Sequence, residues 1–270
     1  MNITLEQLDT ISLRYIDAMS KYSKIIKICC GTGCVSSGAL KVYEELKRVL
    51  TDRGLIDEVL VKKTGCHGLC ERGPIVVLGD EEILYQSVGK RNINEDITAL
   101  LKTIGENEIV DRLLYQGEDK GKRYISPRDI PFYAGQKRIV LSLNGIIDPE
   151  DIEEYISKGG YRALYKALLM EPEEIIEWVE KSGLRGRGGG GFPTGTKWRS
   201  CRVAHGDIKY VVANGDEGDP GAFMDRSLME GNPHSIIEGM IIGGYAIGSN
   251  QGFIYVRDEY PLAVNRLIGN

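Results

Sequence analysis

Four of the six cysteines fall into two pairs within the first 70 residues of the chain. Cys29 and Cys34 are separated by four residues, and Cys66 and Cys70 by three. Each pair lies in a glycine-containing turn that follows a segment rich in strand-forming residues. Because neighbouring loops would bring the two pairs together, we expect a four-thiolate metal site.

The spacing of these pairs favours a [2Fe–2S] cluster over zinc. Structural zinc sites usually separate their two pairs by about 15–20 residues, whereas a whole helix and strand are expected between these pairs. Glycine amides in the turns also suit donation to cluster sulfur atoms. Zinc and redox-active thiols are the alternatives. Cys30 and Cys201 are interpreted as small buried or spare thiols, and His67 as a residue that lines the loop.

A glycine-rich run from Gly183 to Trp198 is the second feature with chemical potential. It contains seven glycines and three basic residues, and it has too little apolar surface to form a core. Such a segment brings backbone close to a ligand, and a phosphate is the expected one. A literal Gly-x-Gly-x-x-Gly spans 186–191, but a helix is expected before it at 172–181. A strand must stand there in an ordinary Rossmann turn, so that interpretation is rejected.

The side chains around this run suit a nucleotide. Arg187 and Lys197 are candidates for binding phosphate, and Phe192 and Trp198 for stacking. A helix expected to start near Thr194 would add a favourable site for an anion.

An acidic segment follows the strand expected at 210–213. It carries Asn214, Asp216, Glu217 and Asp219, at the position where open α/β sheets usually contact ligands. Carboxylates there suit ribose or ribityl hydroxyls. A calcium-binding turn is the alternative, although the ligand periodicity of an EF-hand is absent.

Hydrophobic periodicity predicts an α/β fold around these segments. In the first half we expect strands at 24–29, 57–63, 75–78 and 82–88, and a first helix opened by a Thr4–Gln7 capping box. A second helix is expected from Ser36 or Ser37 to Gly54, with Leu40, Tyr43, Leu46 and Leu50 facing inward. A third is expected to be capped by Asn94, with Ile97, Leu101 and Ile104 facing inward. In the second half we expect strands at 137–143, 210–213 and 252–256 and helices at 172–181, 235–247 and from the cap Asp148 to residue 158.

Composition excludes several classes of protein. The net charge of −5 and the pI near 5.5 argue against nucleic-acid binding. Residues 1–10 have no apolar core of a secretory signal, and the apolar stretch 239–256 is interrupted by polar residues, so we expect no membrane span. We therefore predict a cytoplasmic protein.

The glycine run 183–198, followed by the stretch 214–226, resembles the FMN- and NADH-binding flavoprotein subunit of respiratory complex I and its relatives. Those relatives include NAD(P)-linked and electron-bifurcating iron hydrogenases and NAD-dependent formate dehydrogenases. The paired cysteines resemble the thioredoxin-like [2Fe–2S] ferredoxin domain that several soluble hydrogenase flavin subunits carry ahead of the flavin domain. The resemblance covers nearly the whole chain.

The resemblance implies a division into three parts. Residues 1–105 would form the thioredoxin-like ferredoxin domain, 106–136 a connector, and 137–270 a Rossmann-like α/β domain that binds FMN and NADH. Because the family continues well beyond the position of Asn270, the last domain is expected to be incomplete. The family's [4Fe–4S] cluster would belong to that further part.

Carried over by position, the resemblance also implies the ligand-binding residues. FMN would be held by Gly186, Arg187, Gly188, Lys197, Asn214, Asp216 and Glu217. Phe192 would stack on the nicotinamide dinucleotide, and Asp219 would lie near its ribose, which favours NADH over NADPH. The stretch 255–261 resembles a third family segment beside the flavin, with Tyr255 and Glu259 as contacts.

The expected function is electron input: the chain would pass electrons between NAD(H) and iron–sulfur clusters through FMN, as one component of a soluble multisubunit hydrogenase. No general acid or base is expected, because the cofactor carries the chemistry. Partners would be a hydrogenase or dehydrogenase catalytic subunit and a small ferredoxin-like subunit. The alternatives are the flavin component of a formate dehydrogenase or complex I-type enzyme, a non-catalytic relay or assembly subunit, and a zinc-binding scaffold.

Overall fold

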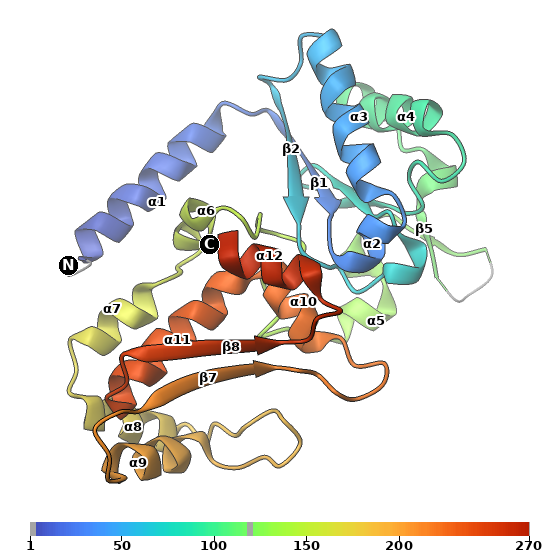
Figure 1. The fold of residues 1–270 in the computed structure, drawn as a ribbon. Coiled ribbons are helices and arrows are strands. Elements are labelled where there is room, and N and C mark those ends of the chain that lie inside the picture. The colour runs from blue at the N-terminus through green and yellow to red at the C-terminus, as the bar shows by residue number, and fades with distance from the viewer. Residues whose placement is uncertain (1–3, 118–120, 270) are drawn as a thin grey trace.

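The computed structural model describes residues 4–117 and 121–269, and it is an α/β structure, as predicted (Figure 1). Its strands are β1 (Lys24–Cys29), β2 (Val59–Thr64), β3 (Val76–Leu78), β4 (Ile83–Tyr85), β5 (Tyr115–Gln116), β6 (Arg123–Tyr124), β7 (Tyr210–Gly215) and β8 (Gln251–Val256). Its helices are α1 (Leu5–Ser20), α2 (Thr32–Ser36), α3 (Ala39–Asp52), α4 (Ile93–Glu106), α5 (Pro131–Ala134), α6 (Ile152–Ser157), α7 (Arg162–Leu168), α8 (Pro172–Lys181), α9 (Thr194–Val203), α10 (Met224–Gly231), α11 (Pro233–Ile247) and α12 (Pro261–Gly269).

The first sheet has the order β2-β1-β3-β4. β1 pairs in parallel with β2, and β3 and β4 follow as antiparallel neighbours. Ile26 and Ile28 of β1 are fully buried, and the core around them includes Leu46 of α3 and Leu100 of α4. Because β1 and β2 run the same way, the segments after both strands leave from one edge of the sheet.

Several predictions for this half are confirmed. The Thr4–Gln7 capping box opens α1, β1 has the predicted bounds, and β3 is entirely buried. Gly54 follows the last turn of α3 with φ 70°, the left-handed conformation typical of a residue after a helix C-cap.

Other predictions for this half, on where helices begin and which residues cap them, were wrong. The helix expected from Ser36 or Ser37 begins at Ala39, because Gly38 adopts φ 100° and separates it from the short α2. The inward face consequently uses Val42, whereas Leu40 is 45% exposed. Asn92, not Asn94, caps α4, since its side chain accepts from the Glu95 N–H.

The strand boundaries also moved. β2 begins and ends later than the expected 57–63, and β4 is shorter than the expected 82–88. Glu82 and Ser87 flank β4 with positive φ, which strand geometry does not allow.

The second half is built on β7 and β8, which pair in parallel. α10 and α11 connect them, α11 packs on the sheet, and α8 packs on α9. The predicted strands at 210–213 and 252–256 and the helices at 172–181 and 235–247 are confirmed with small changes of bounds. The predicted strand at 137–143 was wrong: the segment forms turns, and Ile139 is 73% exposed.

Asp148 does not cap the helix that follows it. Asp151 does, because its carboxylate accepts from the N–H groups of Glu153 and Glu154, and α6 therefore starts at Ile152. Asp148 instead accepts from the Glu150 N–H in the preceding turn.

Contacts between the two halves are extensive. α1 packs against α6 and α7 (Figure 1), and Leu113, Tyr124 and Ile130 from the expected connector join the core of the first sheet.

Three residues of that connector, 118–120, lie outside the described residues, as do 1–3 and Asn270. The domain boundaries at 105 and 136 stay a prediction. Within the described ranges, no helix is long and apolar enough to cross a membrane.

We predict that Gly65→Ala destabilises the chain by about 1–3 kcal/mol, as overpacking does. A Cβ at Gly65 would lie 2.5 Å from the Gly231 Cα, a backbone atom of the other half. Gly105→Ala is the matched control, because a Cβ there meets nothing within 4 Å, and helix propensity should raise stability by about 0.5–1 kcal/mol. Urea unfolding measures both, and equal stability of the two variants would contradict the close approach of the two backbones.

Candidate functional site

The two cysteine loops meet at one edge of the first sheet. The parallel register places Cys29, the last residue of β1, opposite Thr64, the last residue of β2. The loop after β1 leads directly into α2, which carries Cys34, and the loop after β2 carries Cys66 and then Cys70. The topology therefore converts a long separation in sequence into a short one in space.

The structure brings the four predicted ligands together. The Cys66 and Cys70 sulfur atoms are 3.5 Å apart, and the thiols of Cys34 and Cys66 are the groups that raise the pKa of Cys29 most. Glycines make this approach feasible. A Cβ on Gly31, Gly33 or Gly73 would lie only 3.0 Å from the Cys66 Cβ, 2.9 Å from the Cys70 Cβ or 2.8 Å from the Cys34 Sγ, respectively.

The environment favours a thiolate at Cys66. Hydrogen bonding from the Cys29 and Cys70 thiols lowers the pKa of Cys66, and the Gly68 N–H, 3.2 Å from its sulfur, acts in the same direction. The pKa of Cys29 is raised chiefly by its hydrogen bond to Cys34, and that of Cys70 by its hydrogen bond to Cys66. The pKa of Cys34 is lowered, chiefly by its hydrogen bond with Cys29. Since metals bind thiolates, Cys66 and Cys34 are prepared for a metal, and Cys29 and Cys70 would release protons on binding.

The remaining residues near the loops fit their assigned structural roles. Burial raises the pKa of Cys30 to about 12, so this thiol stays protonated. Desolvation lowers the pKa of His67 to about 4, and its ring lies where a Cβ on Gly145 would be 2.5 Å from the His67 Cε1. A neutral ring pressed against backbone agrees with the interpretation of His67 as a loop-lining residue.

In residues 4–117 and 121–269, no group of three or more His, Cys, Asp or Glu side chains is arranged to hold a metal ion. The group that the four cysteines would hold therefore stays a prediction. Zinc would require four ligands around one centre, whereas a [2Fe–2S] cluster divides four thiolates between two irons.

The glycine run forms a loop with a closed neck and an open tip. The Gly186 N–H donates to the Phe192 carbonyl at 2.9 Å, and the Thr194 N–H donates to the Leu184 carbonyl at 2.9 Å. At the tip, a Cβ on Gly188 or Gly190 would meet no atom within 4 Å. The tip thus offers backbone N–H groups to a ligand.

The predicted side chains of this loop are accessible. Arg187 is exposed, and Phe192 is 56% exposed. Lys197 lies one turn into α9 and lines a pocket of about 370 Å³ together with Val212 and Ala213 of β7. Trp198 lines the same pocket, and its ring packs against Gly243 of α11.

The acidic segment is ordered by its own hydrogen bonds. The Asn214 side chain accepts from the Asp216 N–H at 2.9 Å. Glu217, at φ 48°, accepts from the N–H groups of Asp225 at 2.7 Å and Arg226 at 3.1 Å. These N–H groups belong to the second and third residues of α10, and the N-cap residue of the helix, Phe223, makes no side-chain bond. Glu217 therefore caps α10.

The third predicted stretch lies beside the acidic segment. Tyr255 of β8 is in register with Asn214 of β7, and it is 60% exposed. Glu259 pairs with Arg257 at 3.1 Å, and Arg257 also donates to the Glu217 carbonyl. Asp219 is exposed in the turn that precedes α10. The carboxyl ends of the two strands thus gather polar groups from both segments, as ligand sites in α/β sheets do.

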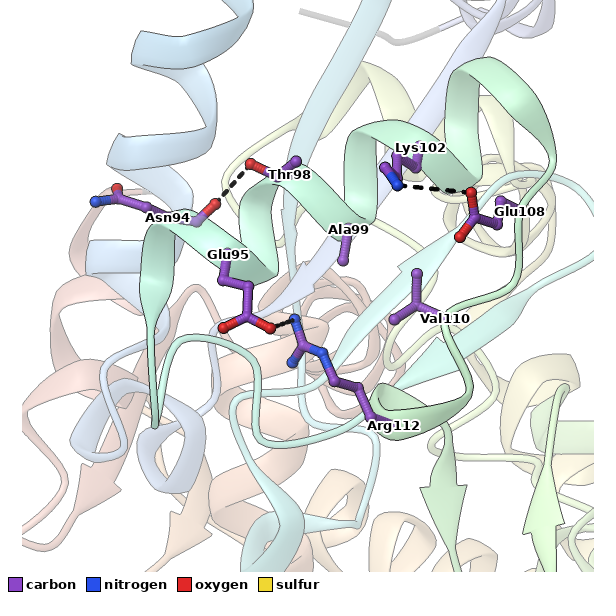
Figure 2. Close-up of a pocket in the computed structure, with 8 residues that line it drawn as sticks. All are labelled: Asn94, Glu95, Thr98, Ala99, Lys102, Glu108, Val110 and Arg112. Carbon is purple, nitrogen blue, oxygen red and sulfur yellow. Dashed lines mark hydrogen bonds and ion pairs between the residues drawn. The ribbon is translucent and has the colours of Figure 1, made fainter.

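A surface pocket of about 410 Å³ lies between α4 and residues 108–112 (Figure 2). None of its lining residues belongs to the glycine run or the acidic segment. Its charged side chains neutralise one another: Glu95 pairs with Arg112 at 3.1 Å, and Lys102 with Glu108 at 3.7 Å. We do not regard it as a ligand site.

Comparison with known proteins finds relatives for part of the chain. Residues 179–269 match the Nuo51 FMN-binding domain. The chain is 55% identical over 132 residues to an NADP-reducing hydrogenase component, HndC, of Solidesulfovibrio fructosivorans, and 57% identical over 110 residues to a component of the NADH-quinone oxidoreductase of Aquifex aeolicus. These alignments cover 49% and 41% of this chain but only 27% and 26% of the relatives. The chain thus spans about a quarter of their length.

Two solved structures are also similar. An NAD⁺-reducing [NiFe]-hydrogenase aligns over 98% of this chain and 45% of its own, at 21% identity and a TM-score of 0.41. A thioredoxin-like [2Fe–2S] ferredoxin from Aquifex aeolicus aligns over 36% of this chain and 99% of its own, at 23% identity and a TM-score of 0.31. Both scores are below 0.5.

Two residues next to the cysteine loops were not foreseen. Glu230 and Arg266 lie at the ends of α10 and α12 and contact the loop between Cys30 and Thr32. No local motif marks them, because their partners are about 200 residues away in the sequence.

We predict that Glu217→Ala lowers the free energy of unfolding by about 1 kcal/mol even without ligand, because α10 loses its cap. Asp219→Ala is the control, since this exposed side chain caps no helix. Urea unfolding of both variants provides the measurement. An unchanged stability for Glu217→Ala would show that the carboxylate is held only for a ligand.

Proposed function

We propose that this chain is the electron-input part of a larger oxidoreductase, passing electrons between NAD(H) and an iron–sulfur cluster through FMN. One observation carries the proposal: four cysteines converge in the same chain in which residues 179–269 match an FMN-binding domain. Nicotinamide exchanges electrons in pairs and clusters exchange them singly, and FMN, when bound, supplies the conversion.

The cluster-binding part would be a thioredoxin-like domain over residues 1–105, with the expected connector at 106–136. Cys29, Cys34, Cys66 and Cys70 would hold the [2Fe–2S] cluster. The amide of Gly68, which points at the Cys66 sulfur, supports this assignment, because hydrogen bonds to sulfur tune such clusters.

The remaining part, 137–270, would bind the flavin and the nucleotide. The open amides around Gly188, with Arg187 and Lys197, would hold the FMN phosphate. Polar groups of Asn214 and Asp216 would accept from ribityl hydroxyls. Gly186 would keep the neck of the loop closed, and Glu217 would act chiefly by ordering α10 and the acidic turn.

The nucleotide would lie on the exposed side of these loops. Phe192 would stack on the dinucleotide, Asp219 would accept from a ribose hydroxyl and favour NADH over NADPH, and Tyr255 and Glu259 would border the flavin. These side chains bind and orient, and none of them is proposed to move a proton.

The relatives named above belong to multisubunit enzymes, and we propose that this chain also works with other subunits in the cytoplasm. A soluble hydrogenase is the preferred setting, with a catalytic subunit and a small ferredoxin-like subunit as partners. A formate dehydrogenase or a complex I-type enzyme is the alternative setting. We favour no nucleic-acid role, because the acidic net charge of −5 opposes it.

Anaerobically purified protein should contain two irons and two sulfides per chain and absorb visible light. Cys66→Ser should lose most of this iron, whereas Cys201→Ser should retain it, because Cys201 lies in α9 away from the cysteine loops. Metal analysis and absorption spectra measure both. Stoichiometric zinc in a colourless protein would instead support the zinc scaffold.

Flavin fluorescence should fall when FMN is titrated with the chain. Arg187→Ala and Lys197→Ala should each weaken FMN binding about tenfold, since a hydrogen bond to a charged group contributes about 1.5–3 kcal/mol. Arg53→Ala, which removes an exposed arginine at the end of α3, should bind like the parent. Equal affinity for all four proteins would refute the phosphate assignment, and no binding at all would favour the non-catalytic relay or assembly subunit.

A further inference from the structure

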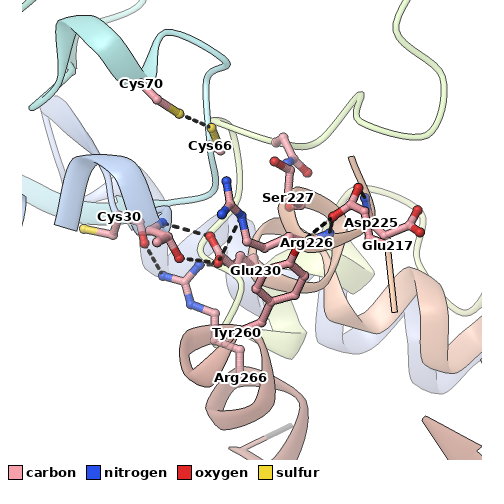
Figure 3. Close-up of polar contacts among 12 residues, drawn as sticks. Cys30, Cys66, Cys70, Glu217, Asp225, Arg226, Ser227, Glu230, Tyr260 and Arg266 are labelled. Atoms are coloured by element: carbon pink, nitrogen blue, oxygen red, sulfur yellow. Dashed lines mark hydrogen bonds and ion pairs between the residues drawn. The ribbon is translucent and has the colours of Figure 1, made fainter. Parts of the chain in front are cut away.

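A buried polar network joins the first cysteine loop to the second half of the chain (Figure 3). Glu230, at the end of α10, is 1% exposed, and Arg266 of α12 is 3% exposed. Charged side chains are almost never buried to this degree without partners. Both contact the segment between Cys30 and Thr32.

Glu230 supplies a cap that the cysteine loop lacks. α2 starts after Gly31, which has no side chain to accept from the first N–H groups of the helix. The Glu230 carboxylate accepts from the Thr32 N–H at 2.9 Å and also from the Thr32 hydroxyl. The orientation of α2, and with it that of Cys34, therefore depends on a residue 198 positions away.

Arg266 secures the other end of this contact. It donates to the Cys30 carbonyl at 3.0 Å and to the Glu230 carbonyl. The second cysteine loop contacts the same end of α10, because Gly65, next to Cys66, packs against the backbone of Gly231. Both cysteine loops thus lie on the C-terminal end of α10.

The opposite end of α10 is held by the acidic segment through Glu217. α10 has eight residues and is therefore about 12 Å long. One short helix consequently joins the proposed flavin loop to the proposed cluster loops, with a carboxylate at each end.

We propose that Glu230 is a positioning residue for the cluster and that its buried charge lowers the cluster's reduction potential; this inference rests on the function proposed above. An electron added to the cluster increases its negative charge. A nearby buried carboxylate opposes that change more strongly than a solvated one, because the interior screens less. Two arginines offset part of the charge: the Arg226 Nε lies 4.0 Å from the Glu230 Oε1, and Arg266 contacts the Glu230 and Cys30 carbonyls. Glu230→Gln therefore measures the contribution of the carboxylate within this charged group.

The test compares Glu230→Gln with Glu238→Gln in the whole chain. Glu238 is a buried carboxylate that accepts from Tyr155, Tyr161 and Leu164 in the second half, so it controls for loss of a buried charge. Iron content and an anaerobic redox titration followed by electron paramagnetic resonance are measured. Glu230→Gln should increase the equilibrium constant for reduction of the cluster about tenfold, which corresponds to a rise in reduction potential of about 59 mV for one electron. Glu238→Gln should match the parent.

A third variant separates positioning from folding. Glu230→Asp keeps the charge on a shorter side chain, so it should keep the parent potential, and it should retain the cluster in any case where Glu230→Gln loses it. The inference is overturned if Glu230→Gln binds the cluster at the parent potential, or if the Gln and Asp variants lose it equally. A parent protein without iron would instead refute the proposed function itself.

Discussion

Parallel pairing of β1 with β2 is the constraint on which the rest of the structure depends. It sends the segments after both strands to one edge of the sheet, and each segment carries two cysteines. An antiparallel pairing would place the two loops at opposite edges and leave two separate thiol pairs. The helix α3 between the strands makes the parallel connection feasible, and its buried Leu46 and Leu50 fix it to the sheet.

The second constraint is the close approach of backbone segments to one another and to the cysteine side chains. Glycine makes this approach sterically possible at a few positions. Gly31, Gly33 and Gly73 leave room for cysteine atoms that a side chain would displace, and Gly65 meets Gly231 across the two halves. The glycines at the tip of the 183–198 loop differ, because open space surrounds them. The first group allows packing inside the protein, and the second leaves the tip of the loop exposed.

The carboxylates near the proposed sites differ in role: some cap a helix, and others are exposed to solvent. The residue type alone does not tell these two roles apart. Glu217 and Glu230 both accept from helix N–H groups, Glu217 at the start of α10 and Glu230 at the start of α2. Asp219 is exposed and remains available to a ligand. Two of the acids near the proposed sites therefore also hold helices, and the site and the fold are built from the same residues.

The sequence by itself determined the α/β class, most strands and helices, the two cysteine pairs and the two long motifs, because these are local patterns of periodicity, capping and residue type. It failed where local signals compete. Residues 137–143 have strand-forming side chains but no neighbouring strand, and Asn92, Asn94, Asp148 and Asp151 are all plausible caps whose choice depends on packing.

Only the tertiary structure decided which groups meet. It packed Trp198 against α11, assigned Glu217 to a helix cap, and placed Glu230 and Arg266 on the loop of Cys30 and Thr32. Glu230 and Arg266 contact residues about 200 positions away, so their contacts exist only after both halves have folded and docked. The contacts of Trp198 and Glu217 lie within the second half and form when its helices pack. No local pattern in the sequence records either kind of contact.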